Sequence, residues 1–145
     1  MKLVFGGAHQ GKRDFAVENL EVKEQDILDV EELCKQIDIK NDRDMFHSLE
    51  ESMNTTGKSA PCVYGLEAFI RLGVYSGRNV DSWLEKWLDE TGPRVIIMRD
   101  VSQGLVPSSP EEREFREANG RALIKIADRA EEVYRVFAGI GQRIK

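Results

Sequence analysis

The sequence has 145 residues, a length at which one domain with a buried core is the expected organisation. Hydrophobic residues make up 41% and charged residues 32%, the composition of a water-soluble globular chain, so we expect residues 1–145 to form a single domain. The formal net charge of −5 argues against nucleic acid as a partner. No apolar run approaches the roughly 18 residues of a membrane span, which argues against a membrane partner.

The cysteines and the first residues bear on the compartment. Cys34 and Cys62 do not form a CxxC pair, and we expect free thiols in a reducing compartment rather than a disulfide. The apolar run at residues 3–5 is too short for a secretory signal. Together these features predict a cytoplasmic protein.

The first 60 residues predict two strands and one helix before their pattern becomes hard to read. The apolar run at 3–5, bounded by glycines, is typical of a buried strand. A helix is predicted from about 12 to 20, and the alternation at 26–30 predicts a second strand. Residues 31–60 are charged and show no clear period, and the polar stretch 54–59 predicts a loop.

The middle of the chain has clearer periods. Residues 61–66 predict a strand that ends at Glu67, and a helical pattern follows at once. Asp81 is predicted to cap a helix whose apolar positions include Trp83 and Trp87, which we expect in the core. The unbroken apolar run at 95–98 is typical of a strand buried on both faces.

The last third begins with a helix-start pattern. Ser109 is predicted as the N-cap, Pro110 as the first helical residue, and Glu112 as the partner that closes a capping box. A final strand is predicted at 133–137. Strands that alternate with helices in this way predict an α/β fold: a parallel sheet with helices on both faces.

A phosphate-binding motif follows the first strand and opens the first helix. The pattern is G-x-x-x-x-G-K, formed by Gly6, Gly7, Ala8, His9, Gln10, Gly11 and Lys12. Glycines allow backbone amides to surround phosphate oxygens, and the helix N-terminus adds partial positive charge. The lysine then reaches the outer phosphates, so these residues predict a P-loop for GTP or ATP. A glycine-rich turn with a chance lysine is the alternative.

The residue after the motif lysine is Arg13. A P-loop ordinarily has Ser or Thr there, whose hydroxyl binds Mg²⁺, and arginine cannot bind a metal cation. Three possibilities stay open: Mg²⁺ is held differently, the nucleotide binds without it, or catalysis is impaired. We predict no metal-ligating residue, and we expect the Arg13 side chain beside the nucleotide.

Two carboxylates follow predicted strands. Glu67 comes after the strand at 61–66, and Asp100 comes after the strand at 95–98. Ligands of open α/β sheets bind at the carboxyl ends of strands, so either group could hold Mg²⁺ through water or polarise an attacking hydroxyl. A cap or turn role is the alternative for each. His47 could serve as a nucleophile in nucleotidyl transfer, although a bystander histidine is commoner.

Four segments resemble the cobinamide kinase/cobinamide-phosphate guanylyltransferase family, and they occur in the family's order. Residues 4–12 resemble its opening strand and Gly-Gly-Ala-x-x-Gly-Lys loop. Residues 100–107 resemble its segment that ends in Gly-Ile-Val-Pro, and residues 115–121 resemble Phe-Arg-Asp-x-x-Gly-Arg. Residues 132–145 resemble its final strand and tail. Arg13 departs from the family's serine.

The resemblance implies a P-loop NTPase fold of the RecA-like kind and a role in adenosylcobalamin biosynthesis. The family uses ATP or GTP to phosphorylate adenosylcobinamide, then transfers GMP to the product through a guanylylated histidine, and it forms homo-oligomers. By the same resemblance Lys12, Glu67 and Asp100 would be catalytic, and Arg121 would face the nucleotide. The alternative is a catalytically impaired homologue that binds nucleotide or corrinoid as a regulatory or partner subunit. Whether the chain is an enzyme stays open at this point, because Arg13 replaces the usual Mg²⁺ ligand.

Overall fold

The computed structural model describes residues 1–36, 42–90, 92–102 and 104–145. Residues 37–41, within the stretch that gave no clear period, and Gln103, within the segment 100–107, lie outside the described residues. The strands of the described chain are β1 (Lys2–Gly6), β2 (Ile27–Asp29), β3 (Cys62–Tyr64), β4 (Val95–Arg99), β5 (Glu132–Phe137) and β6 (Ile140–Arg143). Its α-helices are α1 (Lys12–Asn19), α2 (Val30–Gln36), α3 (Asp42–Ser59), α4 (Leu66–Tyr75), α5 (Val80–Glu90) and α6 (Pro110–Arg129), and a 3₁₀ helix spans Glu24–Asp26.

The strands form one sheet in the order β2-β3-β4-β1-β5-β6. The neighbours from β2 to β5 pair in parallel, and β6 pairs antiparallel with β5. β1 is central, and its Leu3 and Val4 are 1% and 0% exposed, as expected for a strand covered on both faces. The carboxyl ends of the parallel strands therefore meet at one edge of the sheet.

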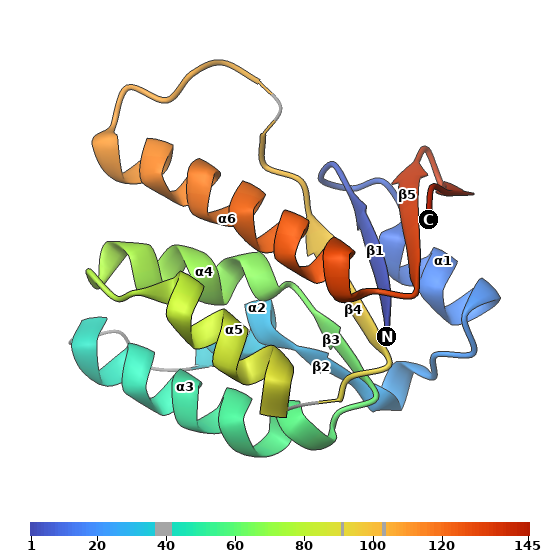
Figure 1. The fold of residues 1–145 in the computed structure, drawn as a ribbon, viewed down its shortest axis with the longest axis horizontal. Helices are drawn as coiled ribbons and strands as arrows, with labels where there is room; N and C mark the ends of the chain where they lie inside the picture. Colours follow the sequence, from blue (N-terminus) through green and yellow to red (C-terminus); the bar gives the residue numbers. More distant parts are fainter. Residues whose placement is uncertain (37–41, 91, 103) are drawn as a thin grey trace.

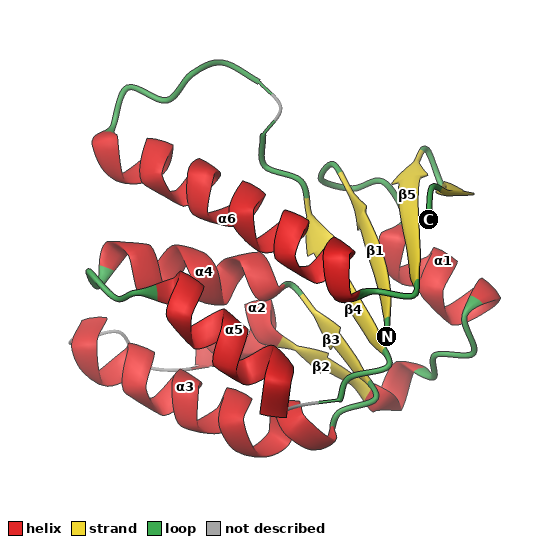
Figure 2. Ribbon diagram, in the orientation of Figure 1, coloured by secondary structure: helices red, strands yellow, loops and turns green. Residues whose placement is uncertain are grey.

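Helices cover both faces of the sheet, as predicted (Figure 1). α1 packs on one face, where Phe15 and Ala16 join Val4 and Val136 in one apolar cluster. The helices α2 to α6 supply the larger cluster on the other face; Figure 2 shows these helices on one side of the strands and α1 on the other. The predicted α/β, P-loop-type fold class is confirmed.

A row of aromatic rings holds the larger layer together. The ring centroids of Phe46 and Phe69 are 4.9 Å apart, and those of Phe69 and Trp83 are 4.2 Å apart. Trp83 stacks on Trp87 at 5.4 Å, and the Trp87 indole nitrogen donates to the Met53 carbonyl at 3.1 Å. The core position predicted for Trp87 is confirmed, since it is 1% exposed, and Trp83 is partly buried against the same cluster.

The loop predicted at residues 54–59 is wrong, because these residues complete α3. Apolar side chains one turn apart in this helix, Leu49 and Met53, are both 0% exposed. The hydroxyl of Thr55 donates to the carbonyl of Glu51 at 2.8 Å, so a polar side chain is satisfied within the helix itself. Burial of the apolar face outweighs the weak helix propensity of the polar residues.

The N-cap of α5 differs from the prediction. The side-chain oxygen of Asn79 accepts from the backbone N–H of Ser82 at 3.0 Å, so Asn79 is the cap. Asp81, predicted for this role, lies in the first turn of the helix. Both side chains suit a helix start, and the sequence alone did not choose between them.

The start of α6 confirms half of its predicted capping box. The Ser109 hydroxyl accepts from the Glu112 N–H at 3.4 Å, with Pro110 in the first turn. The Glu112 carboxylate does not return to the cap. It accepts from the Tyr75 hydroxyl at 2.6 Å and from Arg71, both on α4, so this carboxylate joins two helices instead of closing the box.

The cap leads to a prediction. Ser109→Ala should lower the free energy of unfolding by about 1 kcal/mol, the usual cost of losing an N-cap side chain, as measured by urea unfolding. Ser108→Ala is the matched control, because Ser108 is an exposed neighbour outside the helix, and it should leave the unfolding midpoint unchanged. Equal effects of the two substitutions would show that the cap contributes nothing.

The final strand is predicted correctly as β5, but β6 was missed. β6 includes Gly141, which is a poor strand former. Its positions are exposed or half-buried, so they lack the alternation of buried and exposed side chains that would indicate a strand. The two cysteines are free, as predicted; burial raises the pKa of the Cys34 thiol to about 11 and that of Cys62 to about 12. None of the helices in the described ranges has the length and apolar character that a membrane crossing requires.

Candidate phosphate-binding site

The P-loop residues form a tight turn between β1 and α1. β1 ends at Gly6 and α1 begins at Lys12, as the motif predicts. His9 and Gly11 adopt left-handed φ angles of 55° and 77°, and at Gly11 the missing side chain makes this conformation easy. The first-turn amides of α1 have no partner within the helix. The turn therefore presents N–H groups at the positive end of a helix, where an anion is stabilised.

Lys12 lies against this turn. Its side chain is among the buried polar groups, at 6% exposure, and its ammonium donates to the Gly7 carbonyl at 2.7 Å. Burial lowers the pKa of Lys12, and the nearby Glu67 carboxylate opposes that shift. A buried ammonium that donates to a neutral carbonyl gains from an anionic partner, and a phosphate in the turn would supply one.

The hairpin of β5 and β6 holds the turn in place. The Gln10 side-chain oxygen accepts from the Ala138 N–H at 2.6 Å, and the Gln10 carbonyl accepts from the Gly139 N–H at 2.9 Å. At Gly6 an added Cβ would lie 2.3 Å from the Val136 carbonyl oxygen. The absence of a side chain at the first motif glycine thus allows β1 to approach β5 closely. The hydrogen bonds to the hairpin fix the turn without a ligand.

A cavity of about 320 Å³ opens beside the turn. Its lining residues come from the P-loop, α1, α2, β3 and β4, and they are His9, Gln10, Gly11, Lys12, Arg13, Asp14, Glu31, Tyr64 and Arg99. Sequence reasoning missed Glu31, Tyr64 and Arg99. Each lies at or just after the carboxyl end of a strand, which is where ligands of parallel sheets bind, so strand ends were the signal that could have found them.

Arg13 is held by two carboxylates. Its guanidinium lies 2.8 Å from a Glu24 oxygen and 3.0 Å from an Asp29 oxygen, and it stacks over the Tyr64 ring at 5.5 Å. The hydrogen bond with Glu24 raises the pKa of Arg13. The place that a P-loop gives to a magnesium-binding hydroxyl therefore holds a fixed cation.

The residues of the site do not fit Mg²⁺ in the usual P-loop manner. Arg13 supplies a positive charge in place of an oxygen ligand. Among the described residues, no three His, Cys, Asp or Glu side chains gather into a metal-binding group. The side chain at the metal position is therefore a cation, where an ordinary P-loop has an oxygen ligand for Mg²⁺.

Glu67 stands behind the cavity, in the first turn of α4. It is 8% exposed, and one carboxylate oxygen accepts from the backbone N–H of Arg99 at 3.1 Å. The other oxygen lies 3.7 Å from the Arg99 Nε. Burial raises the pKa of Glu67, and the hydrogen bond from the Arg99 backbone opposes part of that rise. This carboxylate contacts Arg99 and is absent from the cavity lining.

Asp100 lies next to the start of the P-loop. Its backbone N–H donates to the Gly6 carbonyl at 2.9 Å. Its carboxylate accepts from the N–H of Ser102 at 2.9 Å and from the Ser102 hydroxyl at 2.5 Å. The side chain therefore closes the turn that follows β4, while its backbone ties β4 to the phosphate loop.

The structure does not bring Arg121 to this cavity. Arg121 lies in α6, where its Nε is 2.9 Å from an Asp81 oxygen of α5 and another nitrogen is 3.0 Å from Glu114. The other histidine, His47, is exposed on α3, with its Nε2 3.8 Å from a Glu51 oxygen. Of the two histidines, only His9 lines the cavity.

Comparison with known proteins assigns the chain to a family. The family model "Cobinamide kinase / cobinamide phosphate guanyltransferase" matches residues 68–144, more than half of the chain. The bifunctional adenosylcobalamin biosynthesis protein CobU of Escherichia coli (strain K12) is 41% identical over 51 residues, and that of Salmonella typhimurium (strain LT2) is 39% identical over 51 residues. These matches cover 35% of this chain and 28% of each relative, so the chain aligns with under a third of their length. The chain belongs to the cobinamide kinase / cobinamide phosphate guanyltransferase family.

Proposed function

We propose that the chain binds GTP or ATP in the P-loop cavity and acts in adenosylcobalamin biosynthesis by phosphorylating adenosylcobinamide. The observation that carries the proposal is Lys12, a buried ammonium lying on a glycine-rich turn at a helix N-terminus. That arrangement suits a polyphosphate, and the family supplies the corrinoid as the acceptor. Transfer of GMP to the phosphorylated product is the second step of the same proposal.

The proposed roles follow from where each group lies. The amides of residues 6–13 bind the phosphates, and Lys12 exchanges its Gly7 carbonyl for the outer phosphate oxygens. There its charge opposes the negative charge of the transferring phosphoryl group. Asp100, beside the loop, takes the proton of the attacking hydroxyl. Glu67 acts through Arg99 as a positioning residue.

A second function is favoured by one observation, the ion pairs of Arg13 with Glu24 and Asp29. They fix a cation where Mg²⁺ would bind, and phosphoryl transfer in P-loop proteins relies on that metal. The chain would then bind nucleotide or corrinoid without chemistry, as a regulatory or partner subunit. Turnover of a nucleotide with cobinamide would exclude this second function.

The family also bears on the assembly and the compartment. We infer that residues 1–145 form one domain and that the protein acts in the cytoplasm. We also infer that copies of the chain associate with one another. The adjacent Leu105 and Val106 side chains, 93% and 79% exposed, are compatible with such association. Sedimentation of the purified chain would measure it.

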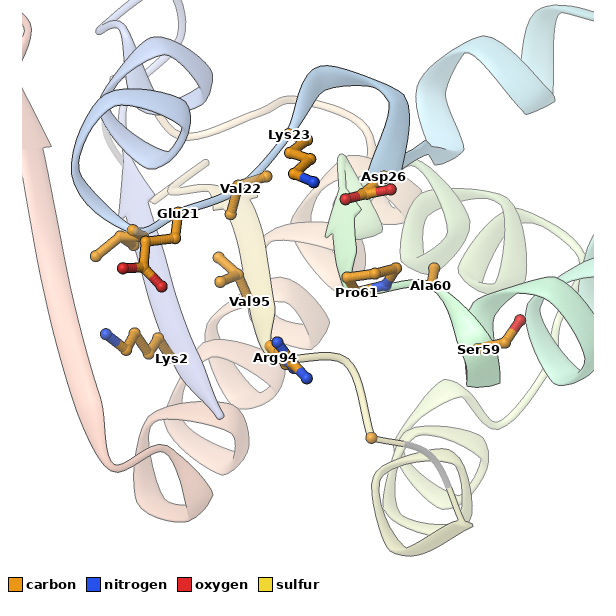
Figure 3. Close-up of a pocket in the computed structure, with 12 residues that line it drawn as sticks. Lys2, Glu21, Val22, Lys23, Asp26, Ser59, Ala60, Pro61, Arg94 and Val95 are labelled. Carbon is orange, nitrogen blue, oxygen red and sulfur yellow. The ribbon is translucent and has the colours of Figure 1, made fainter.

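The nucleotide site is tested by calorimetric titration of GTP and ATP. Lys12→Ala should weaken binding at least tenfold, or about 1.4 kcal/mol. Lys23→Ala is the control, because Lys23 lines a separate cavity of about 510 Å³ at the opposite edge of the sheet (Figure 3), and it should bind as the wild type does. No binding at millimolar nucleotide, or equal binding by Lys12→Ala, would overturn the proposed site.

A further inference from the structure

The cavity contains one cation that the P-loop motif does not explain. Three cationic side chains line it, Lys12, Arg13 and Arg99. Lys12 belongs to the motif, and Arg13 is neutralised by two carboxylates within hydrogen-bond distance. Arg99 comes from the end of β4, two strand positions beyond Ile97, and neither the motif nor the family resemblance assigns it a role.

The backbone of Arg99 is fixed on both sides. Its N–H donates to the buried Glu67 carboxylate at 3.1 Å, and its carbonyl accepts from the Asn119 side chain at 3.0 Å. Asn119 is 1% exposed, so this hydrogen bond is shielded from water. Two buried polar side chains, from α4 and α6, thus set the point from which the arginine side chain extends.

The guanidinium of Arg99 lies between two carboxylates without a short bond to either. One nitrogen is 3.8 Å from a Glu31 oxygen, and its Nε is 3.7 Å from a Glu67 oxygen. Both distances are ion-pair distances and exceed the range of a hydrogen bond. The side chain is 35% exposed, so its planar set of donors is open to the cavity, where it suits phosphate oxygens.

Two carboxylates beside a phosphate loop are an arrangement in which Mg²⁺ could bind. Here a guanidinium stands between them, and Arg13, paired with Glu24 and Asp29, occupies the position of the usual metal-binding hydroxyl. We propose that Arg99 supplies to the nucleotide the positive charge that Mg²⁺ supplies in other P-loop proteins, so that the triphosphate binds as the metal-free anion. This inference rests on the proposed nucleotide site and specifies how that site recognises its ligand.

The test is calorimetric titration of GTP into the wild type and three variants, each in EDTA and in excess Mg²⁺. The wild-type Kd should differ by less than about tenfold between the two conditions. Arg99→Gln should weaken binding in EDTA by at least about tenfold, the loss expected for hydrogen bonds to a charged group. Mg²⁺ should recover part of that loss, because the Glu31 carboxylate, which lines the cavity, then no longer faces a guanidinium.

Two further variants separate charge from structure. Arg99→Lys keeps the positive charge and should bind GTP in EDTA within about tenfold of the wild type. Arg94→Gln removes an arginine that directly precedes the opposite end of the same strand and lines the cavity of Figure 3. It should leave the GTP affinity unchanged. Thermal unfolding of each variant confirms that it is folded before titration.

The outcomes distinguish this inference from the proposed function. Wild-type binding that depends on Lys12 but requires Mg²⁺ would overturn the inference and leave the nucleotide site standing. The inference is likewise overturned if Arg99→Gln binds GTP in EDTA as the wild type does, or if Arg99→Lys loses as much affinity as Arg99→Gln. Absence of binding by the wild type in both conditions would overturn the nucleotide site itself.

Discussion

Replacing Phe69 with alanine should lower the free energy of unfolding by about 3–5 kcal/mol, the range for truncating a buried aromatic ring. Phe69 is 0% exposed and contacts the rings of both Phe46 and Trp83. Its removal leaves a cavity between α3, α4 and α5 and also forfeits the ring–ring contacts. Because α4 carries Glu67 two residues earlier, the loosened helix should also weaken the support of Arg99.

Urea unfolding followed by circular dichroism measures this change. Phe137→Ala is the matched control, since it deletes the same side chain at a site that is 69% exposed, and it should cost less than about 0.5 kcal/mol. A loss below about 1 kcal/mol at Phe69, comparable to that at Phe137, would contradict the packing of the helical layer.

Adding a single methyl group to Gly6 should destabilise the protein by about 1–3 kcal/mol or more, the usual cost of overpacking. The new Cβ would lie 2.3 Å from the Val136 carbonyl oxygen. That oxygen belongs to the backbone of a paired strand, so it can move away only if β5 shifts relative to β1. The same shift would pull the hairpin away from Gln10, so nucleotide affinity should fall together with stability.

The neighbouring glycine is the control. A Cβ on Gly7 would meet its nearest atom, the Gln10 Cγ, at 3.6 Å, an ordinary contact. Gly7→Ala should therefore unfold at nearly the wild-type urea midpoint, while Gly6→Ala unfolds at a clearly lower concentration. Equal midpoints for the two variants would show that β1 and β5 are not packed as closely as the structure indicates.

The P-loop could be predicted because its information is local. The strand at 3–5, the glycines and Lys12 lie within ten residues of one another, and the pattern of one turn fixes their geometry. The apolar run at 95–98 was equally clear, because a strand covered on both faces has no polar positions. These two segments place the phosphate turn next to the end of β4.

The remainder of the site depends on pairing that the sequence does not display. Glu31, Tyr64 and Arg99 reach one cavity because β2, β3 and β4 lie in register, with Tyr64 opposite Ile97. The strands of a parallel sheet are far apart in the sequence, and the packing of the helices between them helps to set that register. No local pattern distinguished Arg99 from the other arginines, and the family pattern drew attention to Arg121 instead.

The errors in secondary structure have a similar origin. Residues 54–59 are poor helix formers, and only the burial of Leu49 and Met53 earlier in the same helix shows why α3 continues through them. β6 lacks the apolar alternation of a strand because its faces are largely exposed, and β5 supplies the pairing that creates it.

The hydrogen bond between Gln10 and Ala138 joins residues 128 positions apart in the chain. On the ribosome the glycine-rich turn is therefore made more than a hundred residues before the backbone that braces it. Closing so long a loop is slow compared with forming a helix. The proposed nucleotide binding should therefore begin only once the hairpin has docked on β1.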